Sequence, residues 1–143
     1  MPQPKRAPGE YQRFERGVLV DELDGVVVIT IRRPEAMNAR HDELNDEILA
    51  VIRRHENDPK VTGFVLTGYG TRAFCAGGDV AGLYREMRDD PNGTVRRDFF
   101  LDEYIVNRRI YRFAKPWISL IDGIDMGGGV GLSVHGSHSV ASE

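Results

Sequence analysis

The chain has 143 residues, a length that fits one domain with a substantial core. Its formal net charge of −3 and its 41% hydrophobic content are ordinary for a globular protein, so no nucleic-acid partner is expected. Its single cysteine, Cys75, rules out an internal disulfide framework and suits a reducing compartment. The sequence has neither the ~18-residue apolar run of a membrane helix nor the apolar core of a signal peptide, so no membrane association and a cytoplasmic location are expected.

The chain is expected to begin with a flexible, Pro-containing tail at residues 1–16, followed by a folded core at 17–143. The core opens with two β-prone runs, Gly17–Leu23 and Val26–Ile31, which flank Asp24-Gly25. An Asp-Gly pair tolerates the positive φ angles of a tight turn, so these runs predict an antiparallel hairpin. The next segment, residues 32–39, is a predicted loop whose arginines, Arg32 and Arg33, are expected to be solvated.

A helix and a buried strand follow. Asp42 is expected to cap the helix, and Leu44, Ile48 and Ile52 recur at helical spacing along its apolar face. The run Val61–Thr67 is almost continuously apolar, which is typical of a strand buried on both faces and parallel to its neighbour. The order of strand, strand, helix, strand and helix predicts an α/β fold of repeated ββα units.

A second, longer helix is predicted between Thr94, its expected cap, and Ala114. Its apolar side chains recur at helical spacing and are expected to face the core: Phe99, Val106, Ile110 and Phe113.

Two glycine-rich stretches follow predicted strands and open into predicted helices. The first is Ala73–Val80, Ala-Phe-Cys-Ala-Gly-Gly-Asp-Val, and the second is Met126–Gly136, after the apolar run Trp117–Ile121. Glycine lets a ligand approach the backbone closely, and free N–H groups at a helix N-terminus carry partial positive charge. Such donors suit an anion, or the negative oxygen that develops when a carbonyl is attacked. The alternative is that the glycines only permit close packing of helix on strand.

As a set, these motifs resemble the enoyl-CoA hydratase/isomerase (crotonase) superfamily. The resemblance rests on Ala73–Val80, on Asp-Gly-Ile-Asp-Met-Gly-Gly-Gly-Val-Gly-Leu at 122–132, on Arg33–Ala39 and on Lys115-Pro116, so it covers nearly the whole chain. Within the superfamily, Val130–Gly136 is most similar to the 3-hydroxyisobutyryl-CoA hydrolase branch. The resemblance implies the N-terminal portion of a crotonase-like spiral of ββα units.

The resemblance also implies a small-molecule acyl-CoA thioester as substrate, with no further cofactor and no metal. The thioester carbonyl oxygen would lie between the N–H groups of Gly78 and Gly128, the expected catalytic pair. The expected substrate-contacting residues are Glu103, Ala76, Asp79 and Val80. Glu103 matches the Glu of a Glu-Tyr pair in the hydrolase branch and is expected to bind the hydroxyl of the acyl group.

Without the resemblance, two of these residues have simpler interpretations. Asp79 stands where a helix N-cap would stand, because Asp at a helix start accepts backbone N–H bonds. Glu103 alone is a charged helix residue that would be solvated.

Gly131 bears on the choice of reaction. Hydratases of the superfamily carry at the aligned position one of two glutamates that handle water, and a glycine cannot transfer a proton. Hydrolysis of a 3-hydroxyacyl-CoA is therefore favoured over hydration. The carboxylates of the hydrolase branch follow the segment that matches 140–143, so the chain is expected to be truncated before the catalytic acid region and to have little turnover alone. Superfamily members commonly form trimers or hexamers, so a homo-oligomer is a further expectation.

Several other functions stay open at this point. An enoyl-CoA hydratase/isomerase and a non-catalytic acyl-CoA-binding fragment are both compatible with the motifs. A serine thioesterase with Ser133 as nucleophile is disfavoured. A nucleophile elbow has the pattern Gly-x-Ser-x-Gly, and the run that starts at Gly131 has His135 in place of the second glycine. His135 and His138 are too few ligands for a metal. Cys75 has no evident general base nearby and is expected to be a packing residue.

Overall fold

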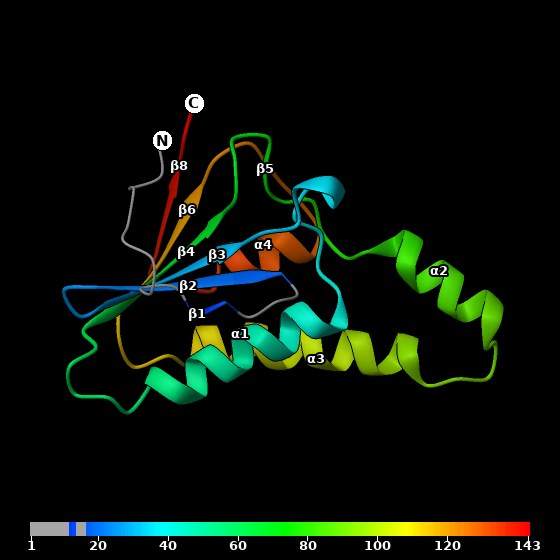
Figure 1. Cartoon of the computed structure of the whole chain (residues 1–143), viewed down its shortest axis with the longest axis horizontal. Helices are drawn as coiled ribbons and strands as arrows, with labels where there is room; N and C mark the ends of the chain where they lie inside the picture. Colours follow the sequence, from blue (N-terminus) through cyan, green and yellow to red (C-terminus); the bar gives the residue numbers. More distant parts are fainter. Residues whose placement is uncertain (1–11, 14–16) are drawn as a thin grey trace.

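The computed structural model describes residues 12–13 and 17–143 (Figure 1). The tail expected at residues 1–16 lies outside the described residues, except for strand β1 (Gln12–Arg13), which pairs antiparallel with β2 (Val18–Leu23). In the described part of the chain, no helix is both long enough and apolar enough to cross a membrane.

A six-stranded sheet, in the order β1-β2-β3-β4-β6-β8, is the centre of the fold. β2 and β3 (Val26–Ile31) form the predicted antiparallel hairpin. Asp24 and Gly25 form its turn with φ angles of 49° and 84°, the left-handed backbone that a two-residue hairpin needs.

The rest of the sheet is parallel, which confirms the parallel pairing predicted for the run Val61–Thr67. β3 pairs with β4 (Gly63–Gly68), β4 with β6 (Trp117–Ile121), and β6 with β8 (His138–Ala141). A second sheet of two short parallel strands, β5 (Ala73–Cys75) and β7 (Ile124–Asp125), was not predicted from the sequence. It joins the two glycine-rich stretches.

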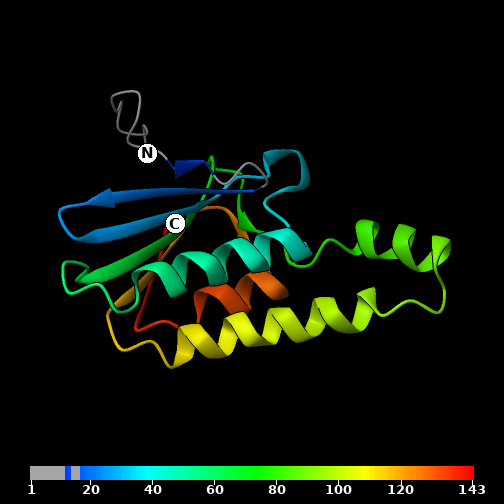
Figure 2. The ribbon, with the colours of Figure 1, turned by 60° about the horizontal axis from the view of Figure 1, so that its bottom comes forward.

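Three helices lie together on one face of the main sheet: α1 (Asp42–His55), α3 (Val95–Tyr111) and α4 (Gly128–Ser133) (Figure 2). Between them and the sheet lies the core, in which Phe64 stacks on Trp117 with ring centroids 5.4 Å apart. Burying an aliphatic or aromatic side chain of this kind stabilises a fold by about 1.5–3 kcal/mol. The predicted apolar faces of α1 and α3 are confirmed, since their apolar residues are buried, except that Phe113 lies beyond the end of α3 and is only partly buried.

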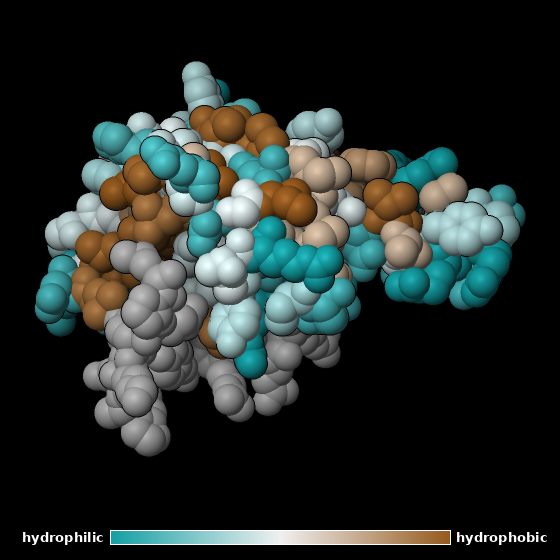
Figure 3. All heavy atoms as spheres, turned by 90° about the horizontal axis from the view of Figure 1, so that it is seen from above, coloured by the Kyte–Doolittle hydropathy of each residue, from teal (hydrophilic) through white to brown (hydrophobic). Residues whose placement is uncertain are grey.

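Helix α2 (Val80–Asp89) contributes no buried residue and projects from the body of the molecule (Figures 1 and 3). Three of its large side chains, Val80, Tyr84 and Met87, are exposed. Apolar and hydrophilic side chains therefore share its surface (Figure 3).

The start of α1 differs from the prediction. The N-cap is His41, whose Nδ1 accepts a hydrogen bond of 3.2 Å from the Leu44 N–H, and Asp42 is the first residue inside the helix. His41 has extended backbone, with φ −135° and ψ 174°, which brings its ring nitrogen to the free amide of the first turn. At α3 the predicted cap position, Thr94, is confirmed, but its side chain makes no capping hydrogen bond.

Candidate active site

Most of the site residues lie in, or directly after, loops that leave the same end of neighbouring parallel strands, whereas Glu103 lies on α3. These loops follow β3, β4 and β6, which end at Ile31, Gly68 and Ile121 (Figure 1). Because parallel strands bring their carboxyl ends to one edge of a sheet, residues far apart in the sequence meet there, and α/β proteins bind ligands at this edge.

The two glycine-rich stretches are in contact. β5 pairs with β7, and the Met126 N–H donates to the Cys75 carbonyl at 3.1 Å. A Cβ atom added to Gly77 would lie 3.6 Å from the Gly128 nitrogen, so the turns pack backbone against backbone. Gly77 has φ +108°, a conformation that L side chains rarely adopt.

The two candidate donors, the amides of Gly78 and Gly128, are not used by the fold. Gly128 opens α4, where the first N–H groups have no partner within the helix. Neither its N–H nor that of Gly78 donates to another residue in the described part of the chain. Both glycines are partly exposed.

Beside these glycines lies a residue that sequence reasoning missed, Arg40. Its side chain is fully buried. The guanidinium donates to Asn45 Oδ1 from Nε and Nη2, at 2.9 and 2.7 Å, and from Nη1 to Asn107 Oδ1 at 3.1 Å and to the Gly128 carbonyl at 3.0 Å. Burial lowers the pKa of Arg40, and the charge of Glu103 acts in the opposite direction.

A signal for this network was present in the sequence. Asn45 lies on the apolar face of α1, three and seven residues before Ile48 and Ile52, and Asn107 lies on the buried stripe of α3. A polar side chain within a buried helix face needs a hydrogen-bond partner. The two asparagines therefore indicate a buried donor, which the structure identifies as Arg40.

Its sequence position alone suggests that Glu103 is solvated, but in the structure it is not. Its side chain is 12% exposed, and Oε1 lies 3.9 Å from Arg40 Nη1. A Cβ atom added to Gly128 would lie 3.0 Å from Glu103 Oε1, so the carboxylate stands next to this glycine. The structure thus brings together Glu103 and Gly128.

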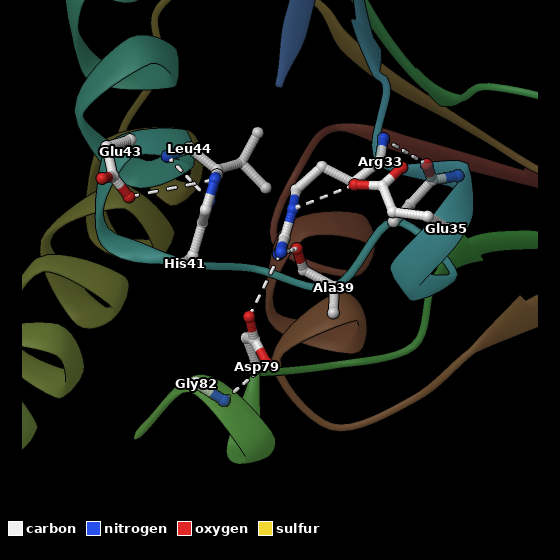
Figure 4. A network of polar contacts seen from close by, with 9 residues as sticks. Arg33, Glu35, Ala39, His41, Glu43, Leu44, Asp79 and Gly82 are labelled. Carbon is white, nitrogen blue, oxygen red and sulfur yellow. Dashed lines mark hydrogen bonds and ion pairs between the residues drawn. The ribbon is translucent and has the colours of Figure 1, made fainter. Parts of the chain in front are cut away.

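Asp79 is the N-cap of α2, as its position predicts (Figure 4). Its carboxylate accepts from the Gly82 N–H at 2.9 Å and from Arg33 Nη2 at 3.2 Å. Burial acts to raise the pKa of Asp79, but the Gly82 N–H and the Arg33 guanidinium outweigh it and hold this pKa below its ordinary value.

The prediction that Arg33 is solvated was wrong. Its side chain is 15% exposed and also donates to the Ala39 carbonyl at 2.7 Å (Figure 4). The loop after β3 folds back as a 3-10 turn at Pro34–Ala36, which carries the arginine against Asp79. Arg32 is exposed, with its guanidinium carbon 5.3 Å from the centroid of the Tyr69 ring.

The other two expected substrate-contacting residues flank the first glycine turn. Ala76 is partly buried, and its N–H donates to the Met37 carbonyl at 3.1 Å. Val80 begins α2 and is 73% exposed. Their side chains therefore differ in accessibility, and their roles stay predictions.

The two candidate nucleophiles, Cys75 and Ser133, are both buried. Burial raises the pKa of the Cys75 thiol to about 11, which confirms that Cys75 is a packing residue. Ser133 is buried and donates to Asp125 Oδ2 at 2.6 Å, and in the described residues it has no histidine partner. His138 Nδ1 lies 2.9 Å from Ser137 Oγ, and across residues 17–143 no group of three or more His, Cys, Asp or Glu side chains is arranged to hold a metal ion.

The space next to Gly131 is filled. A Cβ atom at this position would lie 2.5 Å from Asn107 Nδ2 and 3.0 Å from its Oδ1. Asn107 is itself held by Arg40. A glutamate at this position, which the resemblance associates with hydratases, would have to displace the asparagine.

Comparison with known proteins identifies the family. A sequence profile described as enoyl-CoA hydratase/isomerase matches residues 26–143. The 3-hydroxyisobutyryl-CoA hydrolase of Gallus gallus, named as mitochondrial, is 41% identical over 126 residues, which are 88% of this chain and 32% of that protein. The 3-hydroxyisobutyryl-CoA hydrolase 1 of Arabidopsis thaliana is 39% identical over 88% of this chain and 33% of that protein. The chain thus spans about a third of the length of these relatives.

Solved structures of two enzymes resemble this chain in both fold and sequence. A carnitinyl-CoA dehydratase from Mycobacterium thermoresistibile has a TM-score of 0.82 and 40% identity, over 88% of this chain and 36% of that chain. An enoyl-CoA hydratase from Rhodobacter sphaeroides 2.4.1 has a TM-score of 0.83 and 40% identity, over 89% and 37%. The expected crotonase-like α/β fold is confirmed, and the chain belongs to the enoyl-CoA hydratase/isomerase family.

Proposed function

We propose that this chain carries the carbonyl-binding part of an acyl-CoA hydrolase acting on 3-hydroxyisobutyryl-CoA or a closely related 3-hydroxyacyl-CoA. The N–H groups of Gly78 and Gly128 donate to the thioester carbonyl oxygen. Water adds to the polarised carbonyl carbon, the C–S bond breaks, and the free hydroxy acid and CoA are released. The relatives whose names state this activity match most of this chain.

The observation that supports this proposal most strongly is the contact of the two glycine turns, each with an N–H that the fold leaves unused. Two donors fixed by the backbone need no reorganisation when charge develops on the oxygen. Loss of one such donor typically costs about 3 kcal/mol of barrier, so a pair contributes a large part of the catalysis without any titrating group.

In this proposal, Glu103 determines which acyl group is bound. Its carboxylate stands next to Gly128 in a largely buried position. A buried carboxylate accepts a hydrogen bond strongly and is destabilised when the acceptor is left empty. In the proposal, Glu103 accepts from the 3-hydroxyl of the acyl group, which lies close to the carbonyl in such a thioester.

A second candidate function, hydration of an enoyl-CoA, is favoured by the names of the two solved structures that are 40% identical. The filled space at Gly131 opposes it, because the second glutamate that hydration uses has no room there. Release of CoA is therefore the preferred reaction.

A panel of three thioesters tests the choice: 3-hydroxyisobutyryl-CoA, isobutyryl-CoA and the corresponding unsaturated thioester. A thiol reagent measures released CoA, and loss of ultraviolet absorbance measures hydration of the unsaturated compound. Turnover is expected to consist of CoA release from the hydroxylated thioester. Hydration faster than CoA release would contradict the proposal.

Calorimetry tests Glu103 without requiring turnover. The chain is expected to bind 3-hydroxyisobutyryl-CoA about tenfold more tightly than isobutyryl-CoA, which corresponds to about 1.4 kcal/mol for one hydrogen bond to a charged group. Glu103→Gln is expected to reduce this preference, because the amide oxygen still accepts a hydrogen bond but carries no charge. Glu56→Gln is the matched control, because Glu56 lies at the far end of α1 and pairs with Arg109. Equal preference in the wild type and Glu103→Gln would show that the hydroxyl is bound elsewhere.

Two further points belong to the proposal. A homo-oligomer, a trimer or a hexamer, is expected from the family, and light scattering of the purified chain measures it. A cytoplasmic location is proposed from the sequence, although vertebrate relatives are named as mitochondrial. Fractionation of the source cells decides between these compartments.

A further inference from the structure

Arg40 is a buried guanidinium whose hydrogen bonds account for all of its donors. A guanidinium has five N–H groups, and the Arg40 guanidinium donates five hydrogen bonds. The fifth runs from Nη2 to the Glu103 carbonyl at 3.4 Å. A buried charge is strongly destabilising unless it is paired and fully hydrogen-bonded, so each acceptor around Arg40 is needed.

These acceptors belong to three different helices. Asn45 is on α1, Glu103 and Asn107 are on α3, and Gly128 is the first residue of α4. The helices therefore meet at one planar group. Since a guanidinium is rigid and has fixed donor directions, it orients its partners more closely than a flexible ammonium would.

The backbone of the same residue holds the other glycine turn. The Arg40 N–H donates to the Gly77 carbonyl at 2.7 Å, and the Asp79 N–H donates to the Arg40 carbonyl at 2.7 Å. Together they form a parallel bridge that brackets Gly78. One residue thus contacts Gly78 through its main chain and Gly128 through its side chain.

We propose that Arg40 is the positioning residue of the carbonyl-binding site, holding Gly128 through its carbonyl, and the Glu103 carboxylate, against the turn that contains Gly78. This inference rests on the proposed function, because it concerns the same site. The main chain and the side chain of this residue have separate roles. Any residue except proline can keep the backbone bridge to Gly78, but only an arginine can bind both Gly128 and Glu103.

These separate roles predict what truncation does. In Arg40→Met, the bridge around Gly78 stays, whereas the Gly128 carbonyl, Asn45 and Asn107 lose their donor. The Gly128 carbonyl belongs to the peptide that follows the Gly128 amide, so loss of its donor loosens the residue that carries this amide, and the thioester carbonyl is polarised less. A residue important only for folding would lower stability without changing the polarisation of a bound carbonyl.

Infrared difference spectroscopy with isobutyryl-CoA carrying ¹³C at the thioester carbonyl reads this polarisation directly. Each hydrogen bond to the oxygen lowers the stretching frequency, and no turnover is needed. Spectra are recorded at saturating ligand for the wild type, Arg40→Met and a control, Arg109→Met. The control removes a partly exposed arginine of α3 whose Nη2 donates to both carboxylate oxygens of Glu56 and makes no contact with Arg40.

A second variant addresses folding. Arg40→Met combined with Asn45→Leu removes both the buried charge and its main acceptor, and apolar replacement of a whole buried polar group is often neutral for stability. Should both variants fail to fold, Arg40→Lys replaces them, because a single ammonium cannot reach Asn45 and the Gly128 carbonyl with the geometry of a guanidinium.

The expected result is a full downshift of the carbonyl band in the wild type and in Arg109→Met, and a downshift about half as large in the folded Arg40 variants, since one of two donors is misplaced. A full downshift in any folded Arg40 variant would overturn the positioning role while leaving the proposed function intact. No downshift of bound thioester in the wild type would overturn the proposed function, and the role of Arg40 with it.

Discussion

Gly131→Ala tests the packing that separates this site from that of a hydratase. In the middle of a helix, alanine is normally more stable than glycine by about 1 kcal/mol. Here the new methyl group would lie 2.5 Å from Asn107 Nδ2, well inside van der Waals contact. The asparagine must move, and its hydrogen bond from Arg40 Nη1 is lost.

The magnitude follows from these contacts. Overpacking a tight site costs about 1–3 kcal/mol, and loss of a hydrogen bond to a buried charge costs about 1.5–3 kcal/mol. Set against the gain in helix propensity, the free energy of unfolding should fall by about 2–4 kcal/mol in Gly131→Ala. In an Asn107→Ala background the methyl group has space, so the same substitution should be neutral or stabilise by up to about 1 kcal/mol.

Urea unfolding of the four proteins in this double-mutant cycle provides the measurement, followed by circular dichroism. The expected coupling between positions 107 and 131 is at least about 2 kcal/mol, far above the additivity of independent sites. A Gly131→Ala protein as stable as the wild type, or a coupling near zero, would refute the claim that Asn107 fills the position.

Three further predictions concern residues around the site. The pKa of Asp42 is raised to about 6, mainly by burial and then by the charge of Glu86, so the folded state binds more protons than the unfolded state between pH 4 and 6. Asp42→Asn should therefore stabilise the protein at pH 8. In pH-dependent urea unfolding this gain in stability should fade towards pH 4, and a gain that stays constant would contradict the prediction. His41→Ala should lower the free energy of unfolding by about 1 kcal/mol at pH 8, measured by thermal unfolding, because it removes the cap of α1. Burial lowers the pKa of His41, so this loss of stability should shrink as the pH falls below the pKa of histidine in the unfolded state. A loss that grows at low pH would show that the charged form is favoured. Cys75 should react slowly with a thiol reagent at pH 8 in the native protein and rapidly in denaturant, because its pKa is about 11; fast native reaction would contradict its burial.

Local sequence signals predicted much of the fold. Asp24-Gly25 specifies a turn through its own backbone preferences, and the apolar run of β4 specifies an inner strand that pairs with β3 and β6. The glycines of both turns were recognised because positions such as Gly77 need a backbone that other residues avoid. These signals act within a few residues, so they can be read without the tertiary structure.

The missed features depend on contacts between distant segments. Arg33 looked solvated because its partner, Asp79, is far along the chain and approaches only through the folded loop after β3. No role was predicted for Arg40, since its acceptors come from three helices that are distant in the sequence. A charged residue is assigned to the surface by default, and only tertiary structure shows where the charge is satisfied.

The central claim is that the Gly78 and Gly128 amides bind the same carbonyl oxygen. Nuclear magnetic resonance of the ¹⁵N-labelled chain tests it, with two CoA ligands that differ in one group: a ketone analogue with CH₂ in place of the thioester sulfur, and a thioether without the carbonyl. We predict that the ketone moves both glycine amide proton resonances downfield with one shared affinity, whereas the thioether binds and leaves them in place. A bound ketone that moves neither resonance, or only one of them, would contradict the account.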